Sequence, residues 1–390
     1  MDARAHERHG PRLHGLVTPR MVLGGALIAC VAAALLTAIA GGLLRVGIAP
    51  VAADAPWLTR AALAHAALMM CGFLGTVISI ERAVAFRHPA AWTTPFASGA
   101  AALALLAGEQ GLAALLLVLA SGAFVIVNAL LLRRQPAAHT ALLLASAVAW
   151  CTGCVLLAVG ADSTAVLPWW FAFLVVTIAA ERLEMTRLMR RRRGAQLALH
   201  LVLGALAWGA ACSGFAPRLG GVVFGAALCA LAAWLLAFDI ARRTVRAEGL
   251  SRFMAVCLLG GYVWLAIAGV AWGATALGQP VRDIALHALG LGFIISMIMG
   301  HAPVILPAVT GVKLQFGNAF YLPLLALHLS LAVRLAGGAA DLHLRAQGAL
   351  FNALAIALFA ATAGGAALVW RQRQRQRQRQ RPRRISSEHP

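Results

Sequence analysis

The stretch 284-IALHALGLGFIISMIMGHAPVILP-307 decides the fold, because it is long and apolar enough to cross a bilayer. It carries two histidines, His287 and His301. Helical rise and twist place them about 21 Å apart on nearly the same face. Pro303 and Pro307 are expected to end or kink this helix. Since an ionisable residue at membrane depth is costly, both histidines are candidate functional groups.

The composition extends this reading to the whole chain. Hydrophobic residues make up 61% of the 390 residues and charged residues only 12%, whereas a soluble domain is nearer half apolar and a quarter charged. The net charge of +20 does not point to nucleic acid, because the basic residues lie in loops and tails between apolar runs. The seven cysteines are scattered over apolar segments, which favours buried thiols over a disulfide framework.

Apolar runs of spanning length predict an all-α polytopic membrane protein with twelve transmembrane helices. The expected spans are 21–44, 61–80, 92–108, 111–132, 139–160, 164–181, 195–213, 219–238, 252–275, 284–307, 318–335 and 346–370. They form one transmembrane domain over 21–370. A basic tail, 1–20, precedes it, and an Arg/Gln-rich tail, 371–390, follows it. We expect the second tail to be disordered and to touch anionic lipid head groups, with RNA binding as the alternative.

The distribution of basic residues fixes the expected orientation. With the amino terminus in the cytoplasm, 27 of the 33 basic residues fall in inner segments. The other six fall in outer segments, namely Arg45, Arg60, Arg218, Arg282, Arg334 and Arg345. One missed helix would scramble this bias, so twelve helices with both termini cytoplasmic is the predicted topology.

A short motif recurs where two of the helices reach the cytoplasmic face. ERAVAFR spans 81–87 and ERLEMTR spans 181–187, and both read E-R-x4-R. The tenth helix has GHAP, 300–303, at the same level. Helices two, six and ten are spaced by four, which suggests three four-helix pseudo-repeats. Chance or interfacial ion pairing explains the motif equally well, and proton uptake is a further interpretation of its carboxylates.

Two histidines enter the membrane from outside at nearly the same depth, His65 on helix two and His287 on helix ten. Two imidazoles at equal depth on two helices are what a bis-ligated haem needs, since neutral imidazole binds iron from each side. His328, on helix eleven, is expected to reach the same outer half, and His301 to lie about 20 Å below. The alternative is that each histidine only forms hydrogen bonds to a neighbouring helix.

A haem between His65 and His287 would need suitable residues around it on the same helix faces. Small residues must flank the ring, apolar side chains must line it, and cations must meet the propionates. The expected glycines are Gly72, Gly75, Gly290 and Gly292, and the expected lining residues are Leu68, Met69, Phe73, Leu291 and Phe293. Arg60 and Arg282 are the propionate partners. Separately, Cys151 and Cys154 form a C-x2-C that suits copper, a disulfide or plain packing.

Three stretches resemble known membrane haem proteins. HALGLGFIISMIMGHA (287–302), HAALMMCGFLGTVISIERA (65–83) and LPLLALHLSLAVRL (322–335) are similar to helices of the NnrS family. The architecture resembles subunit I of the haem-copper oxidases. The resemblance implies haem b, with copper as a second metal, and a role in nitric oxide metabolism or electron handling. It departs from the oxidases because helix six lacks a histidine and helix seven carries only His200. Ala66 also replaces the acidic residue that usually follows the early NnrS histidine.

The sequence therefore predicts an NnrS-like haem protein of a bacterial inner membrane. His65 and His287 are the expected axial ligands, His328 and His301 are second-tier candidates for cofactor binding, and His328 is also a metal candidate. Its partners are the lipid bilayer and nitric oxide or another small gas, while catalysis is left open. The rival interpretations are a twelve-helix secondary transporter and a membrane assembly factor without a cofactor. Against the transporter, the loop ERAVAFRHP (81–89) lacks that superfamily's signature, and membrane carboxylates are scarce.

Overall fold

The computed structural model describes residues 19–49, 54–185, 194–310 and 312–385. Within these ranges the protein contains helices and no strands, and twelve helices are long and apolar enough to cross a membrane. The predicted fold class and number of spans are therefore confirmed for the described residues. The predicted basic tail falls almost entirely, at 1–18, outside the described residues, as do Arg187 and the arginines at 190–193.

The spans follow the apolar runs, with four assembled from several helical segments. In the first half they are α1 (Pro19–Leu44), α3–η1–α4 (His65–Ala67, Leu68–Gly75, Thr76–Phe86), η2–α5 (Pro89–Trp92, Thr93–Ala107), α6 (Gln110–Arg134), α7 (Ala138–Ala158) and α8 (Ser163–Met185). In the second half they are α9 (Ala195–Cys212), α10 (Pro217–Phe238), α12 (Gly249–Ala276), α13–η3–α14 (Arg282–His287, Ala288–Ile295, Ser296–Thr310), η4–α15–η5 (Asn318–Phe320, Tyr321–Ala336, Gly337–Ala339) and α16 (Leu342–Ile385). Short helices α2 (Pro56–Leu63) and α11 (Ala241–Thr244) lie in connections.

The second and tenth spans share an unusual feature, a π-helix immediately below the histidine. The π-helix η1 begins three residues after His65, and η3 begins at the residue after His287. Each is eight residues long. π-Helical turns are rare and are frequent at functional sites. Because a π-helix follows each of the two candidate ligands, the second and tenth spans are the first place to look for a functional site.

The core of the bundle is built around α8, the most buried span, with 78% of its apolar window inside the protein. Phe173 of α8 stacks on Trp150 of α7 at 5.1 Å between ring centroids, and Phe124 of α6 packs edge-on against both. Asp162 caps the start of α8, accepting the backbone N–H groups of Thr164 and Ala165, and these bonds lower the pKa of its exposed carboxyl. The sixth span, α8, is therefore the central helix of the bundle.

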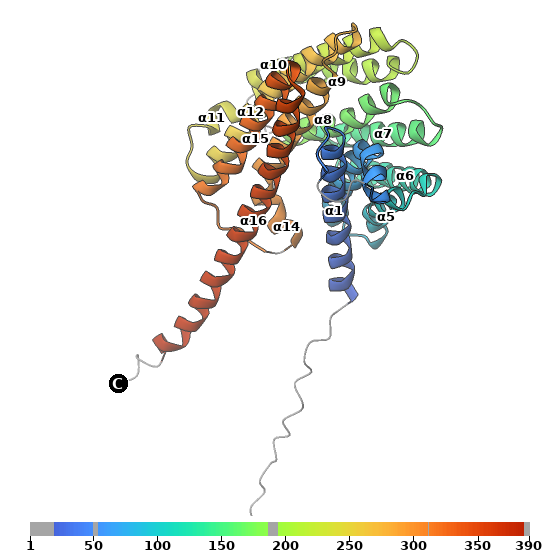
Figure 1. Cartoon of the computed structure of the whole chain (residues 1–390). Coiled ribbons are helices and arrows are strands. Elements are labelled where there is room, and N and C mark those ends of the chain that lie inside the picture. The colour runs from blue at the N-terminus through green and yellow to red at the C-terminus, as the bar shows by residue number, and fades with distance from the viewer. Residues whose placement is uncertain (1–18, 50–53, 186–193, 311, 386–390) are drawn as a thin grey trace, which may run out of the picture.

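The last span continues out of the bundle. α16 runs to Ile385, so the tail that we expected to be disordered from residue 371 is helical through Ile385. Arg and Gln are good helix formers, and an Arg/Gln repeat has nothing that ends a helix until Pro382. In Figure 1, α16 projects beyond the bundle toward the end at which α1 begins, so the two termini of the bundle share one side. This agrees with an even number of spans.

The repeated E-R motifs meet at the end of the bundle remote from the two π-helix histidines. Arg82 pairs with Glu81 at 3.1 Å and with Glu181 of α8 at 3.4 Å. The next residue, Arg182, donates to Nε2 of His301 on α14 at 3.2 Å. Charged side chains therefore connect helix two to helix six and helix six to helix ten. The motif links helices to one another and does more than cap the end of each helix. Glu184 also lies 3.8 Å from His139 of α7.

Candidate functional site: an arginine-rimmed cavity with two histidines

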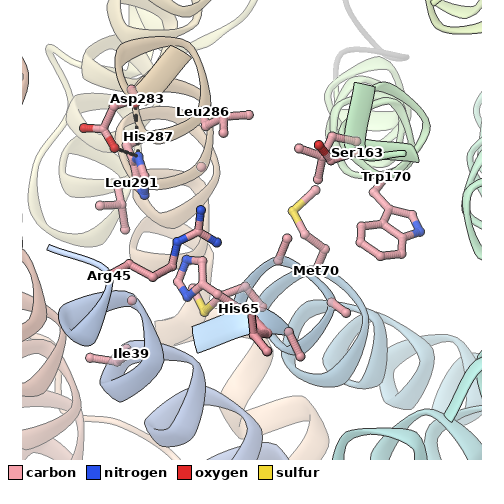
Figure 2. Close-up of a pocket in the computed structure, with 18 of the residues that line it drawn as sticks. Ile39, Arg45, His65, Met70, Ser163, Trp170, Asp283, Leu286, His287 and Leu291 are labelled. Carbon is pink, nitrogen blue, oxygen red and sulfur yellow. Dashed lines mark hydrogen bonds and ion pairs between the residues drawn. The ribbon is translucent and has the colours of Figure 1, made fainter. Parts of the chain in front are cut away.

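A cavity of about 1030 Å³ opens at the end of the bundle where His65 and His287 lie. It is bounded by the ends of α1, α2, α3, α8, α13, α15 and α16, so both halves of the chain contribute walls (Figure 2). Its walls are mainly apolar, with Met70 and Trp170 on one side and Leu291 beside His287. The volume is at the upper end of the range for small-molecule and cofactor sites.

Five arginines line this cavity, against a single acidic residue. They are Arg45, Arg60, Arg282, Arg334 and Arg345. These are five of the six basic residues that the topology assigns to the outer side, and Arg218 is the exception. With Asp283 as the acidic residue, the rim has a formal excess of four positive charges. This excess favours a ligand that carries negative groups.

His65 is held so that one ring nitrogen faces the cavity. Nδ1 lies 2.7 Å from the carbonyl oxygen of Ala38 on α1. A carbonyl only accepts, so Nδ1 carries the proton and the lone pair of neutral His65 is on Nε2. Among the described residues Nε2 has no hydrogen-bond partner. Gly42 leaves room for the ring, since a Cβ there would approach His65 Cε1 to 2.8 Å.

His287 is held in the same tautomer by a charged partner. Nδ1 lies 2.9 Å from Oδ1 of Asp283 and 3.0 Å from its backbone oxygen, and both atoms accept. Arg334 of α15 contacts the same carboxylate through Nη2 and Nε at 3.0 and 3.3 Å. Its Nη2 is also 3.2 and 3.0 Å from the two ring nitrogens. Nε2 of His287 therefore has the Arg334 guanidinium within hydrogen-bond distance in this structure.

The two remaining membrane histidines have no free lone pair. His328 was expected beside the other two, but it does not line the cavity. Its Nδ1 accepts the indole N–H of Trp264 at 2.6 Å, so the proton is on Nε2, which faces Ser296 at 3.3 Å. His301 donates from Nδ1 to Met297 and accepts from Arg182 at Nε2. The meeting of three histidines in the outer half was therefore a wrong prediction.

The expected surroundings are partly corrected. Of the predicted lining residues, Met69 and Leu291 line the cavity, whereas Leu68, Phe73 and Phe293 do not. Of the predicted glycines, Gly290 lines it and a Cβ there would meet nothing within 4 Å. The other glycines serve helix packing, Gly72 against Ala102, Gly75 against Trp150 and Gly292 against Trp264. Gly72 stands seven residues after His65, where regular α-helical spacing would put it on the same face, and the wider turns of η1 rotate it toward Ala102.

The propionate candidates line the cavity, but both already have partners. Arg60 donates to the carbonyl oxygens of Leu106 and Ala107 at the end of α5, and Arg282 donates to Ser163 at 2.7 Å. Sequence reasoning counted Arg45, Arg334 and Arg345 only as outer charges. Arg45 is exposed, and the hydrogen bond that it donates to the carbonyl of Ala62 is 3.5 Å long. It is therefore the arginine with the most freedom to meet a ligand.

Cys151 and Cys154, for which copper, a disulfide and plain packing were the alternatives, are free thiols. Cys154 is buried and interacts with Cys71 of η1, whose sulfur also accepts from the indole of Trp150 at 3.3 Å. Cys151 is only half-buried. Among the described residues there is no group of three or more His, Cys, Asp or Glu side chains that could hold a metal ion. The described residues therefore offer no cluster of three such side chains as a copper site.

Comparison with known proteins gives a family without an assigned activity. No curated protein and no solved structure matches the chain. The family described as a domain of unknown function (DUF8744) matches residues 20–368, which reach from the first span into the last and include every residue that lines the cavity. The chain belongs to this family of domains of unknown function.

Proposed function

We propose that the chain is a membrane haem b protein whose outer cavity holds the haem between His65 and His287. The observation that carries the proposal is the shared state of these two histidines. Each donates Nδ1–H to a fixed acceptor, and each lines the same cavity. This is the pattern by which proteins orient a metal-binding histidine, with the partner of Nδ1 setting the tautomer that presents Nε2. His301 and His328 do not line this cavity.

The donor set fits haem in two further respects. The apolar walls suit a macrocycle, and the arginine rim suits two propionates. Two adjustments are required of the chain's own residues. Arg45, which acts electrostatically on His65 and is drawn between the two rings in Figure 2, has to turn toward the rim. Arg334, whose Nη2 lies 3.0 Å from Nε2 of His287, has to move away from that nitrogen for it to hold a metal ion.

The residues then act as a binding and insulating shell. His65 and His287 hold the iron, and the arginines of the rim orient the haem propionates. The apolar walls exclude water from the haem macrocycle. When bound, haem supplies a redox-active iron that transfers single electrons or binds a diatomic gas such as nitric oxide. We place this site at the outer face of a bacterial inner membrane, with both termini cytoplasmic.

A substitution at Gly290 tests whether the ligand occupies this cavity. Because a Cβ at Gly290 meets nothing within 4 Å, Gly290→Phe projects a ring into open space and should leave the fold intact. We expect the variant to lose most of its haem while its melting temperature stays within about 4 °C of the wild type. The measurement is the haem-to-protein ratio of the purified variant.

Two other glycines provide matched controls for Gly290→Phe. Gly204 of α9 is exposed and equally open, so Gly204→Phe should retain haem. Gly292 contacts Trp264 closely, so Gly292→Phe should impair folding itself. Full haem content in Gly290→Phe would place the ligand elsewhere.

A second candidate function is transport of an amphipathic organic anion through the same cavity. It is favoured by the charge of the rim, four positive charges in excess, which exceeds what two propionates neutralise. The histidines would then accept hydrogen bonds from donor groups of the substrate through Nε2. The two functions separate by colour, since a transporter purified after expression with added haem precursor would be colourless.

A further inference from the structure

The two histidines of the cavity differ in the charge of the group that holds them. His65 donates Nδ1–H to a neutral backbone carbonyl, that of Ala38. His287 donates Nδ1–H to a carboxylate, that of Asp283. A carboxylate partner gives an imidazole more anionic character than a carbonyl does and makes it a stronger donor to a metal ion. The two sides of the site are therefore chemically unequal.

The charge of Asp283 is itself countered within the chain. Arg334 holds both carboxylate oxygens, and its side chain is only 9% exposed, so water screens this pair weakly. The close approach of Gly348 to the backbone of Arg334 packs α16 against α15 behind it. Asp283 belongs to the first turn of α13, four residues before His287. One short helix thus presents both the histidine and its carboxylate, and a second helix supplies the cation.

We infer that Asp283 and Arg334 are opposed positioning residues that set the donor strength of His287, Asp283 raising it and Arg334 restraining it. The inference rests on the proposed haem site, because it concerns the electron density delivered to a metal ion through Nε2. A stronger anionic ligand favours the ferric over the ferrous state. Removing the carboxylate charge therefore raises the midpoint potential, and removing the guanidinium lowers it.

The test is a redox titration of the purified full-length protein, followed by its visible spectrum. Asp283→Asn keeps an oxygen that accepts from Nδ1–H and removes the charge, and we expect its midpoint potential to shift upward. Arg334→Gln leaves Asp283 uncompensated, and we expect a downward shift. Arg334→Lys restores the charge and should return most of that shift. The double variant Asp283→Asn/Arg334→Gln should lie between the two single variants.

Charge changes elsewhere on the outer side are the controls. Asp162 is exposed and outside the cavity, and Arg218 is the outer arginine that does not line it. Asp162→Asn and Arg218→Gln should leave the potential unchanged.

The outcomes separate the two claims. Shifts of opposite sign support the inference, because simple disruption of the site would move both variants the same way or make both high-spin. Unchanged potentials, or shifts of the same sign, with haem retained would overturn the inference and leave the haem site standing. A wild-type protein without haem would overturn the proposed function, and the inference with it.

Discussion

Replacing His65 by alanine is expected to lower haem affinity by about 100-fold or more, because it removes the ligand whose Nε2 faces the cavity without a partner. His287→Ala should have a comparable effect on coordination, either losing haem or converting the remainder to a high-spin form. The measurement is the haem-to-protein ratio and the reduced spectrum of each purified variant. Thermal stability should change little in either protein, since both rings border a cavity.

His328→Ala is the matched control. This ring binds Trp264 and Ser296 outside the cavity, so the variant should be less stable but should retain haem with an unchanged spectrum. Loss of colour in His328→Ala, with His65→Ala still fully loaded, would contradict the assignment of the ligands.

Arg182→Met is expected to cost about 3–5 kcal/mol of stability, the range for removing one partner of a buried charge pair. Arg182 is 3% exposed, donates to His301 and interacts electrostatically with the 5%-exposed Asp239. Burial already raises the pKa of Asp239, which lies between two spans, and Arg182 opposes that rise. The variant would leave a buried carboxylate without its main cation. The readout is thermal unfolding followed with a thiol-reactive dye, since several cysteines are buried.

The sign of the pH dependence follows from the raised pKa. A carboxyl whose pKa is higher in the folded state stabilises the fold when protonated, and the benefit is lost as the pH rises through that value. The deficit of Arg182→Met should therefore shrink as the pH is lowered, and Arg182→Met/Asp239→Asn should recover part of it at neutral pH. Arg246→Met, at an exposed arginine, is the control. A full deficit in the double variant would show that Asp239 is not the group left unpaired.

Much of the fold was predictable because membrane-spanning length and the placement of basic residues are strong signals. Twelve spans and the shared depth of His65 and His287 follow from counting residues. The rotation of a residue about its helix axis does not follow from counting alone. His328 was assigned by depth, yet it faces Trp264 of α12, a contact that no local pattern encodes.

Part of the error near the site comes from the π-helix η1, since Gly72 would share the face of His65 at 100° a residue but packs against Ala102. In the tenth span the same spacing already puts Gly292 and Phe293 about 140° and 120° away from His287, and neither lines the cavity. A usable signal was missed in the arginines. In a chain whose basic residues concentrate on the inner side, six outer arginines call for a reason, and five of them line one cavity. Which histidines line the cavity, the property that separates His65 and His287 from the other two, needed coordinates.

The central claim is that two imidazoles present Nε2 to one iron at the arginine-rimmed cavity. The most direct measurement is the absorption spectrum of the full chain purified from cells supplied with haem precursor. The account predicts a Soret band, with sharp bands of a six-coordinate low-spin haem after reduction. A well-folded, monodisperse protein with no absorption beyond its aromatic residues would contradict it.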